Sequence, residues 1–188
     1  GGGLEHGNST SIGLSSTTLL NDVKSAANIT AHEFFHLWNV KRITNETLLP
    51  LDYQMGAKTT SLWWLEGMTS YYAALTLVRT GIWTEEKFTD HIARQIVILQ
   101  QNSDRLKTSV SKASWASWER GYYTTGISYY NKGQLVGLLL DIMMRQVTSN
   151  KKSLDDVFRY MYLNYAKRGR SFKDGEIQII VEELAGKD

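Results

Sequence analysis

The stretch AHEFFHLWN, residues 31–39, constrains this chain more than any other, because two histidines stand four residues apart with a glutamate directly after the first. On a helix, positions i and i+4 lie on one face, about 6 Å apart along the axis. His32 and His36 can therefore direct two imidazole rings at one ion. Glu33 is rotated by about 100° from His32, which brings its carboxylate beside that ion. The spacing predicts a metal site on one face of a helix.

A third metal ligand is expected further along the chain. A catalytic zinc site takes three protein ligands and leaves the fourth position for water, and no cysteine is present to supply a thiolate. Glu66 lies in the stretch LWWLEGMTSYY, residues 62–72, in a second helix that can return against the first. Its apolar neighbours indicate burial, and a buried carboxylate is either paired or bound to a metal. Glu66 is therefore preferred over the other glutamates of the chain as the third ligand.

Composition and charge place the chain among ordinary globular proteins. Its 188 residues suit a single domain, and the net charge of +2 gives no reason to expect nucleic acid or an anionic membrane as a partner. No apolar run is long enough to span a bilayer, and no signal segment stands at the start, so the compartment stays open. The chain begins Gly-Gly-Gly without a methionine, and we expect it to be a segment of a longer protein.

Hydrophobic periodicity predicts one mainly helical domain, residues 1–188, with about six helices behind a short β or extended segment. Residues 1–20 are rich in glycine, serine and threonine and are expected to form an edge strand and a loop. Residues 28–80 are expected to hold the metal-binding helix pair, and residues 84–188 the helical remainder. The expected helices run from about 28 to 40, 62 to 79, 84 to 101, 130 to 146, 153 to 169 and 174 to 186.

Capping residues support three of these helix starts. Thr84 can cap one helix, Ser153 and Asp156 form a capping-box pattern at another, and Asp174 can cap the last.

Residues 102–128 show no hydrophobic period and are expected to form a long aromatic loop. Loops of this length often line or cover a functional site. The aromatic residues in question are Trp115, Trp118, Tyr122 and Tyr123.

Four blocks of the chain match one known pattern in order and over nearly its whole length: GGGLEHGNS (1–9), AHEFFHLWNVKR (31–42), LWWLEGMTSYY (62–72) and YYNKG (129–133). Together they resemble the glycyl aminopeptidase family of zinc metallopeptidases. The resemblance implies a thermolysin-like catalytic fold in which a glutamate is the third zinc ligand. It also implies an N-terminal β domain, and commonly a C-terminal PDZ domain, both outside the present sequence.

The resemblance also implies a role for each residue of the metal site. His32, His36 and Glu66 would bind one zinc ion, and Glu33 would act as the general base. Manganese or cobalt could replace zinc at such ligands in vitro.

Two further roles follow from the resemblance alone. Tyr130, which opens Tyr-Asn-Lys-Gly, matches a tyrosine that related aminopeptidases use to stabilise the transition state, and the adjacent Tyr129 is the alternative. Glu5 occupies the place of a glutamate that holds the α-amino group of the substrate. Each residue also has a non-functional interpretation. Tyr130 could be an aromatic residue at a helix start that packs into the core, and Glu5 could be an exposed carboxylate.

The sequence therefore favours a zinc aminopeptidase that acts on peptides with a free N-terminus and releases small residues such as glycine or alanine. One alternative is an endopeptidase with the same zinc chemistry. The other is a non-catalytic interaction domain stabilised by zinc, which would need a closed site with four protein ligands.

Overall fold

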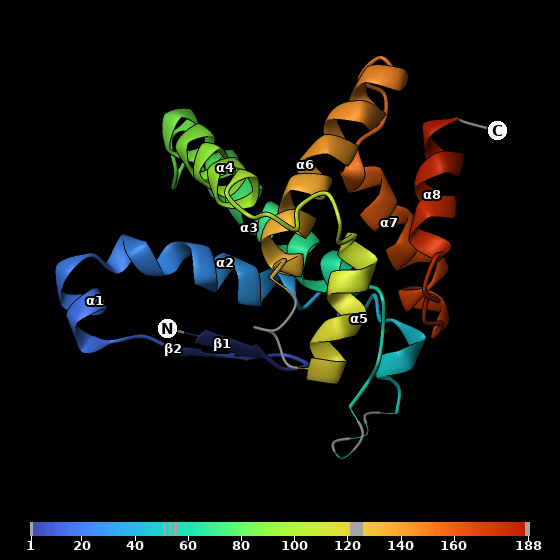
Figure 1. Ribbon diagram of the computed structural model, residues 1–188, viewed down its shortest axis with the longest axis horizontal. Coiled ribbons are helices and arrows are strands. Elements are labelled where there is room, and N and C mark those ends of the chain that lie inside the picture. Colours follow the sequence, from blue (N-terminus) through green and yellow to red (C-terminus); the bar gives the residue numbers. More distant parts are fainter. Residues whose placement is uncertain (1, 51, 53, 55, 121–125, 187–188) are drawn as a thin grey trace.

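The computed structural model describes residues 2–50, 52, 54, 56–120 and 126–186 (Figure 1). It is mainly helical and carries a two-stranded hairpin at the N-terminus, which confirms the expected fold class. Tyr122 and Tyr123 of the expected aromatic loop lie outside the described residues. Within the described part of the chain, no helix is both long and apolar enough to cross a membrane.

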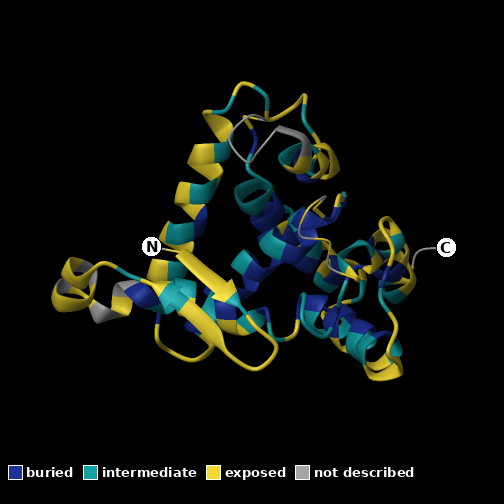
Figure 2. Ribbon diagram, turned by 90° about the horizontal axis from the view of Figure 1, so that it is seen from below, coloured by how far each residue is buried: buried dark blue, intermediate teal, exposed yellow. Residues whose placement is uncertain are grey.

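The N-terminal hairpin lies along the first long helix of the domain. Strands β1 (Gly2–Glu5) and β2 (Thr10–Gly13) pair antiparallel, with Gly3 opposite Ile12. The hairpin contacts α2 (Ala27–Phe35), and its lower face is exposed (Figure 2). It therefore brings the expected edge strand next to the helix that carries the histidine pair.

A short helix occupies part of the region expected to be a loop. Helix α1 (Ser16–Asn21) and the 3-10 turn η1 (Val23–Ala26) lead from the hairpin into α2. The expectation of a loop up to residue 20 is wrong here. Serine and threonine favour caps and turns over helix interiors, so this stretch gave no helical pattern.

Helix α2 ends at Phe35, five residues before the expected end. Val40 has a backbone φ of 108°, a conformation that no α-helix contains and that a β-branched residue adopts at a cost. The Arg42 guanidinium donates to the backbone oxygen of Leu37, so it caps the carbonyl end that the helix dipole makes negative. The chain after His36 is therefore a tight turn.

The element that carries Glu66 forms the centre of the molecule. The expected helix over residues 62–79 is present, but its first part is a π-helix, η3 (Trp63–Met68), followed by α3 (Thr69–Arg79). Trp64, Leu65 and Met68 are no more than 1% exposed. This burial agrees with the apolar neighbourhood expected around Glu66. The main hydrophobic core runs from η3 and α3 to α7 and α8.

Four further helices surround this centre: α4 (Glu85–Gln100), α6 (Tyr129–Val147), α7 (Leu154–Asn164) and α8 (Glu176–Ala185). The Thr84 side chain caps α4, and Ser153 with Asp156 forms a capping box on α7, as expected. Helix α7 ends at Asn164 and not near Gly169. A 3-10 turn, η5 (Ala166–Arg168), fills the difference, and Gly169 ends that turn with a positive φ of 62°.

The expectation of one long loop over residues 102–128 is wrong, because α5 (Val110–Arg120) occupies its middle. Ser109 begins this helix, and its side-chain oxygen accepts from the backbone N–H of Lys112 at 3.1 Å. The residues that α5 buries completely are the small Ala113 and Ser114. Such residues give no hydrophobic stripe, which is why periodicity did not reveal the helix.

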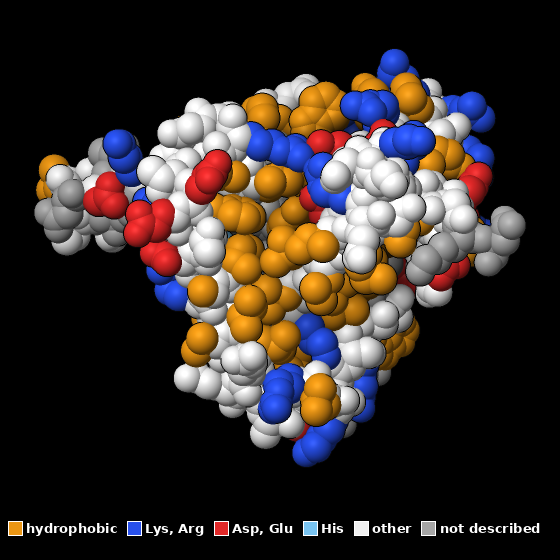
Figure 3. Space-filling view, turned by 90° about the horizontal axis from the view of Figure 1, so that it is seen from above, with side chains coloured by type: hydrophobic (Ala, Val, Ile, Leu, Met, Phe, Trp, Pro, Cys, Tyr) orange, Lys and Arg blue, Asp and Glu red, His pale blue; other side chains and the backbone are white. Residues whose placement is uncertain are grey.

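An apolar groove lies between α6 and α8, lined by residues that include Leu140, Met143, Val147, Val181 and Ala185. Figure 3 shows hydrophobic side chains gathered across the middle of the upper face of the molecule.

Asp174 does not cap α8, and its carboxylate instead holds the connection between the histidine-bearing helix and the helix that carries Glu66. Helix α8 begins after Gly175, whose φ is 90°. Asp174 accepts hydrogen bonds from Asn45 Nδ2 at 2.9 Å, Thr59 Oγ1 at 2.7 Å and the Thr60 backbone N–H at 2.8 Å, and also from the Ser61 hydroxyl. Asn45, Thr59 and Ser61 are at most 2% exposed. The carboxylate therefore fixes residues 45–61 against the C-terminal part of the chain.

We predict that Asp174→Asn lowers the free energy of unfolding by about 1–3 kcal/mol at pH 7, because an amide cannot accept all four hydrogen bonds. Burial alone would raise the pKa of Asp174, but the hydrogen bonds from Ser61, Thr60 and Thr59 hold it below the ordinary value of 3.8. The stabilisation is therefore present above pH 3.8 and is lost as the pH falls below it, toward the folded-state pKa. Urea unfolding of both proteins against pH measures this. A difference that stays constant down to the acid limit would contradict it.

Candidate active site

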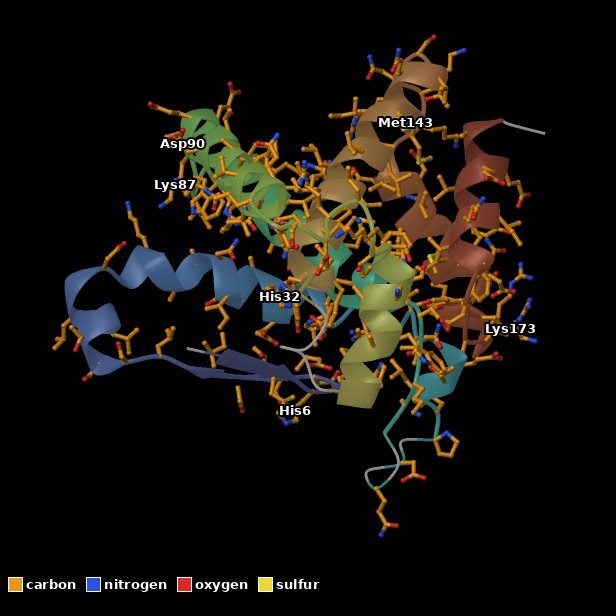
Figure 4. All side chains as sticks on the ribbon, viewed as in Figure 1. His6, His32, Lys87, Asp90, Met143 and Lys173 are labelled. Atoms are coloured by element: carbon orange, nitrogen blue, oxygen red, sulfur yellow. The ribbon has the colours of Figure 1, made fainter. Side chains whose placement is uncertain are left out.

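Three side-chain atoms from two elements meet at one point beside the N-terminus of α6. His32 and His36 come from the end of α2, and Glu66 comes from η3. The two Nε2 atoms are 3.0 Å apart, and Glu66 Oε2 lies 3.1 Å from His32 Nε2 and 3.2 Å from His36 Nε2. In Figure 4, His32 lies at the end of α2 nearest α5 and α6. The three expected metal ligands are thus brought together.

The hydrogen bonds on the far side of each imidazole determine which nitrogen faces this point. His36 Nδ1 lies 3.1 Å from the backbone oxygen of Asn39, which can only accept, so Nδ1 carries the proton. The Ser70 hydroxyl donates to the Glu66 carbonyl at 3.0 Å, so its oxygen is free to accept from His32 Nδ1 at 3.3 Å. Both Nε2 atoms are then lone-pair acceptors. Together with the Glu66 carboxylate they make a cluster of three acceptors that suits a cation.

The geometry of the three acceptors suits a tetrahedral metal ion. Bonds of about 2.0–2.1 Å from such an ion separate its ligand atoms by about 3.3 Å. The separations of 3.0–3.2 Å in this cluster are close to that value. Two imidazoles and one carboxylate, with a fourth position open, are the donor set of catalytic rather than structural zinc. The residues present therefore fit a zinc ion.

The electrostatics of Glu66 agree with the role of a ligand. Burial would raise its pKa, but the adjacent side chains of His32 and His36 hold the pKa at about 2. The carboxylate is therefore ionised at neutral pH.

Glu33 points from α2 toward the hairpin and is 6% exposed. A Cβ atom at Gly3 would lie 2.2 Å from the Glu33 carboxyl carbon, so any side chain at position 3 would displace the Glu33 carboxylate. Burial raises the pKa of Glu33, and the nearby charges of Glu66 and Glu5 raise it further, while His32 and His36 lower it. Glu33 thus lies beside the three ligands, in contact with the β1 backbone.

Glu5 lies at the end of β1, beside the same cluster. One ligand-type atom from each of Glu5, Glu33 and His36 lies within 4.8 Å of the others. Glu5 Oε1 also forms an ion pair with Lys41 Nζ at 3.4 Å. The carboxylate expected to hold a substrate amine is therefore at the site and is partly buried. His6, the next residue, is exposed on the outer side of the hairpin (Figure 4).

Tyr130 is the tyrosine that lies next to the ligands. Its ring centre is 6.0 Å from that of His32, and Tyr129 stacks on it with a centre-to-centre distance of 4.8 Å. Burial raises the pKa of Tyr130, and the negative charge of Glu66 raises it further. The phenol therefore keeps its proton at neutral pH and can act as a hydrogen-bond donor.

Two glycines place α6 against the π-helix at this point. A Cβ at Gly67 would lie 2.6 Å from Gly133 Cα and 2.7 Å from the Tyr129 backbone oxygen. A Cβ at Gly133 would lie 2.6 Å from the Trp63 backbone oxygen. The two helical backbones therefore touch directly, which brings Tyr130 beside Glu66.

Two serines that support the site were not predicted from the sequence. Ser70 contacts His32 Nδ1. It lies four residues after Glu66 and therefore on the same helical face, and this spacing could have predicted its place at the site. Ser114 of α5 accepts from the Trp63 backbone N–H at 3.0 Å and so binds the start of the π-helix. No local pattern pointed to Ser114, because its helix was not recognised.

The fold and the site define a class of protein: a helical domain with a buried His-Glu-x-x-His turn, a glutamate from a neighbouring helix and an edge strand beside both. Comparison with known families agrees. A family model described as M61 glycyl aminopeptidase matches residues 25–136, more than half of the chain. The chain belongs to this family.

A solved structure extends the likeness over most of the chain. It is the crystal structure of an aminopeptidase N family protein from Idiomarina loihiensis, with a TM-score of 0.81 and 26% sequence identity. The match covers 92% of the present chain but only 32% of the other. The chain thus spans about a third of the length of that relative. No curated protein matches the chain.

We predict that Gly133→Ala lowers stability and weakens binding of added zinc, because the new methyl group meets backbone that cannot move aside. Overpacking of this kind costs about 1–3 kcal/mol, more than the helix-propensity gain of about 1 kcal/mol from alanine. Urea unfolding and chelator competition for zinc measure the two effects.

Gly137→Ala on the same helix is the matched control. Its Cβ would meet Met68 Sδ at 2.6 Å, the far part of a flexible side chain, so we expect a smaller loss of stability and unchanged zinc affinity. Equal behaviour of the two variants would contradict a special role for the glycine contact.

Proposed function

We propose that this protein is a zinc-dependent peptidase, more specifically an aminopeptidase that releases small N-terminal residues. The convergence of His32, His36 and Glu66 carries the proposal, because three acceptor atoms with no donor among them need a cation. Membership of the M61 glycyl aminopeptidase family supports the choice of peptide hydrolysis.

When bound, a zinc ion would polarise the scissile carbonyl group and make water a better nucleophile at neutral pH. Glu33 lies beside the ligands and faces the hairpin, the position from which it would accept a proton from the attacking water. It would then pass that proton to the leaving amine. Burial of Glu33 and the raised pKa of its carboxyl favour this exchange, since a general base works best with a pKa near the working pH.

Two further side chains would act on the substrate. Tyr130, protonated beside Glu66, would donate a hydrogen bond to the oxyanion that develops on the scissile carbonyl. Glu5 would hold the ammonium group of the substrate, with the exposed part of β1 offering backbone pairing to an extended peptide.

The preference for a free amino terminus rests on Glu5 and on the names of the relatives. A carboxylate at the end of β1, partly buried among acidic side chains, suits a cation. Lys41 already pairs with it, so a substrate ammonium would join or replace that partner. The preference for glycine or alanine is taken from the family description alone.

We predict that Glu33→Gln retains zinc and lowers kcat by about 10²–10⁴-fold, because the amide keeps the shape of the side chain but cannot accept the proton. Metal analysis of the purified variant, together with its rate on a peptide substrate, tests this. Near-normal turnover by a zinc-loaded variant would exclude Glu33 as the base. Removal of the metal by a chelator should abolish activity in the wild type, and added zinc should restore it.

We also predict that the wild type cleaves a peptide with a free amino terminus much faster than its N-acetylated form. Glu5→Gln should remove most of this difference, mainly by raising KM for the free-amine peptide, because it loses the charge that holds the ammonium. Rates for both peptides with both proteins measure the effect. Equal rates with the wild type would instead indicate an endopeptidase.

A further inference from the structure

We propose that Asn39 is a positioning residue that fixes the histidine-bearing turn to the π-helix that carries Glu66. The inference rests on the metal site of the proposed function, since it concerns how two of the three ligands are held. Asn39 is 0% exposed and contacts both ligand-bearing elements, its backbone facing one and its side chain the other.

The backbone of Asn39 supports the first element. Its carbonyl oxygen accepts from His36 Nδ1 at 3.1 Å, which leaves the His36 Nε2 lone pair facing the cluster. This contact depends on the early end of α2. Val40 takes a φ of 108°, and the backbone of Asn39 then pairs with Ile43 in an isolated β-bridge. The positive φ of Val40 costs conformational energy, and strained backbone of this kind is often found at functional sites.

The side chain of Asn39 supports the second element. Its Nδ2 lies 2.9 Å from the Trp64 backbone oxygen, 3.2 Å from the Leu65 backbone oxygen and 3.0 Å from Thr69 Oγ1. The two carbonyl groups belong to the π-helix, directly before Glu66. Hydrogen bonds within a π-helix follow a wider pattern than those of an α-helix, and such segments are rare. Asn39 binds this unusual turn where it is most buried.

The donor end of the amide accounts for the choice of asparagine. Asn39 Oδ1 is buried and has no hydrogen-bond partner in the described part of the chain, which costs stability. Only the Nδ2 donors offset that cost. An aspartate has the same shape, but it would put an oxygen in front of two carbonyl oxygens. It would repel the π-helix instead of binding it.

The consequence for the site is a direct link between two ligands that are 30 positions apart. Asn39 sets the orientation of His36 through its carbonyl and the position of Glu66 through the preceding two carbonyl groups. The distance of 3.2 Å between His36 Nε2 and Glu66 Oε2 is held by this link. Residues that orient metal ligands affect metal affinity by about 10–100-fold.

The experiment compares zinc affinity, by chelator competition, for wild type, Asn39→Asp and Asn39→Ala. Alanine retains the carbonyl that binds His36 and removes only the link to the π-helix. We expect the zinc Kd to rise by about 10–100-fold in both variants, and more in the aspartate variant. If Asn39→Asp fails to fold, the zinc Kd of Asn39→Ala can still be compared with that of the wild type.

Asn45→Asp and Asn45→Ala are the matched controls. Asn45 is also 0% exposed, but its side chain bonds Thr47 and Asp174 and none of the ligands. These variants should lose thermal stability and keep the zinc Kd of the wild type. Equal losses of zinc affinity at both positions, or unchanged affinity in the Asn39 variants, would overturn the positioning role and leave the proposed function standing.

A measurement on the wild type needs no variant. On titration with zinc, the side-chain amide resonances of Asn39 in a ¹⁵N NMR spectrum should shift, while those of Asn45 should not. Equal or absent shifts at Asn39 in a protein that binds zinc would contradict the inference. A wild type that binds no zinc at all would instead contradict the proposed function, and the inference would fall with it.

Discussion

Three hydrogen-bond acceptors that cannot satisfy one another meet beside the centre of this domain. His32 Nε2, His36 Nε2 and Glu66 Oε2 lie within 3.2 Å of each other, and each imidazole is fixed from behind by a partner of its own. Ser70 and the Asn39 carbonyl orient the two imidazoles. Such an arrangement favours a positive charge at its centre, and the surrounding contacts supply the stability that keeps its members together.

That stability comes from segments far apart in the sequence. The end of α2, the π-helix and the N-terminus of α6 converge on the cluster, and the contact of Gly67 with Gly133 lets two of these backbones touch. Core residues such as Trp64 and Phe158 pack behind them at a ring distance of 5.1 Å. Asp174 joins the connection between the metal-binding elements to the segment before α8. The site is thus built on packed helices, with only the hairpin on an exposed edge.

The histidine pair was predictable because its chemistry depends on spacing within a single helical turn. Glu66 was predictable from the apolar residues around it, and the helix over residues 62–79 from its period. The features that were missed depend on contacts between elements. Helix α5 buries small side chains and shows no stripe, the end of α2 follows from the φ of Val40, and Asp174 bonds residues more than 100 positions away. Sequence periodicity predicts which face of a helix or strand is buried. It does not predict which residue of another element forms a hydrogen bond with each polar group.

The π-helix makes the length of one segment as important as its composition. A wide turn of this kind holds one residue more than the α-helical turn it replaces, so a one-residue deletion within residues 63–68 would restore an ordinary helix. The segments on the two sides of the deletion would keep about the same orientation, but the wide turn that carries Glu66 would be lost. The direction of the Glu66 side chain would change, because the wide turn sets that direction. Substitutions along this stretch can therefore leave the site in place. An insertion or deletion of one residue would instead remove the geometry that directs Glu66 toward the histidines.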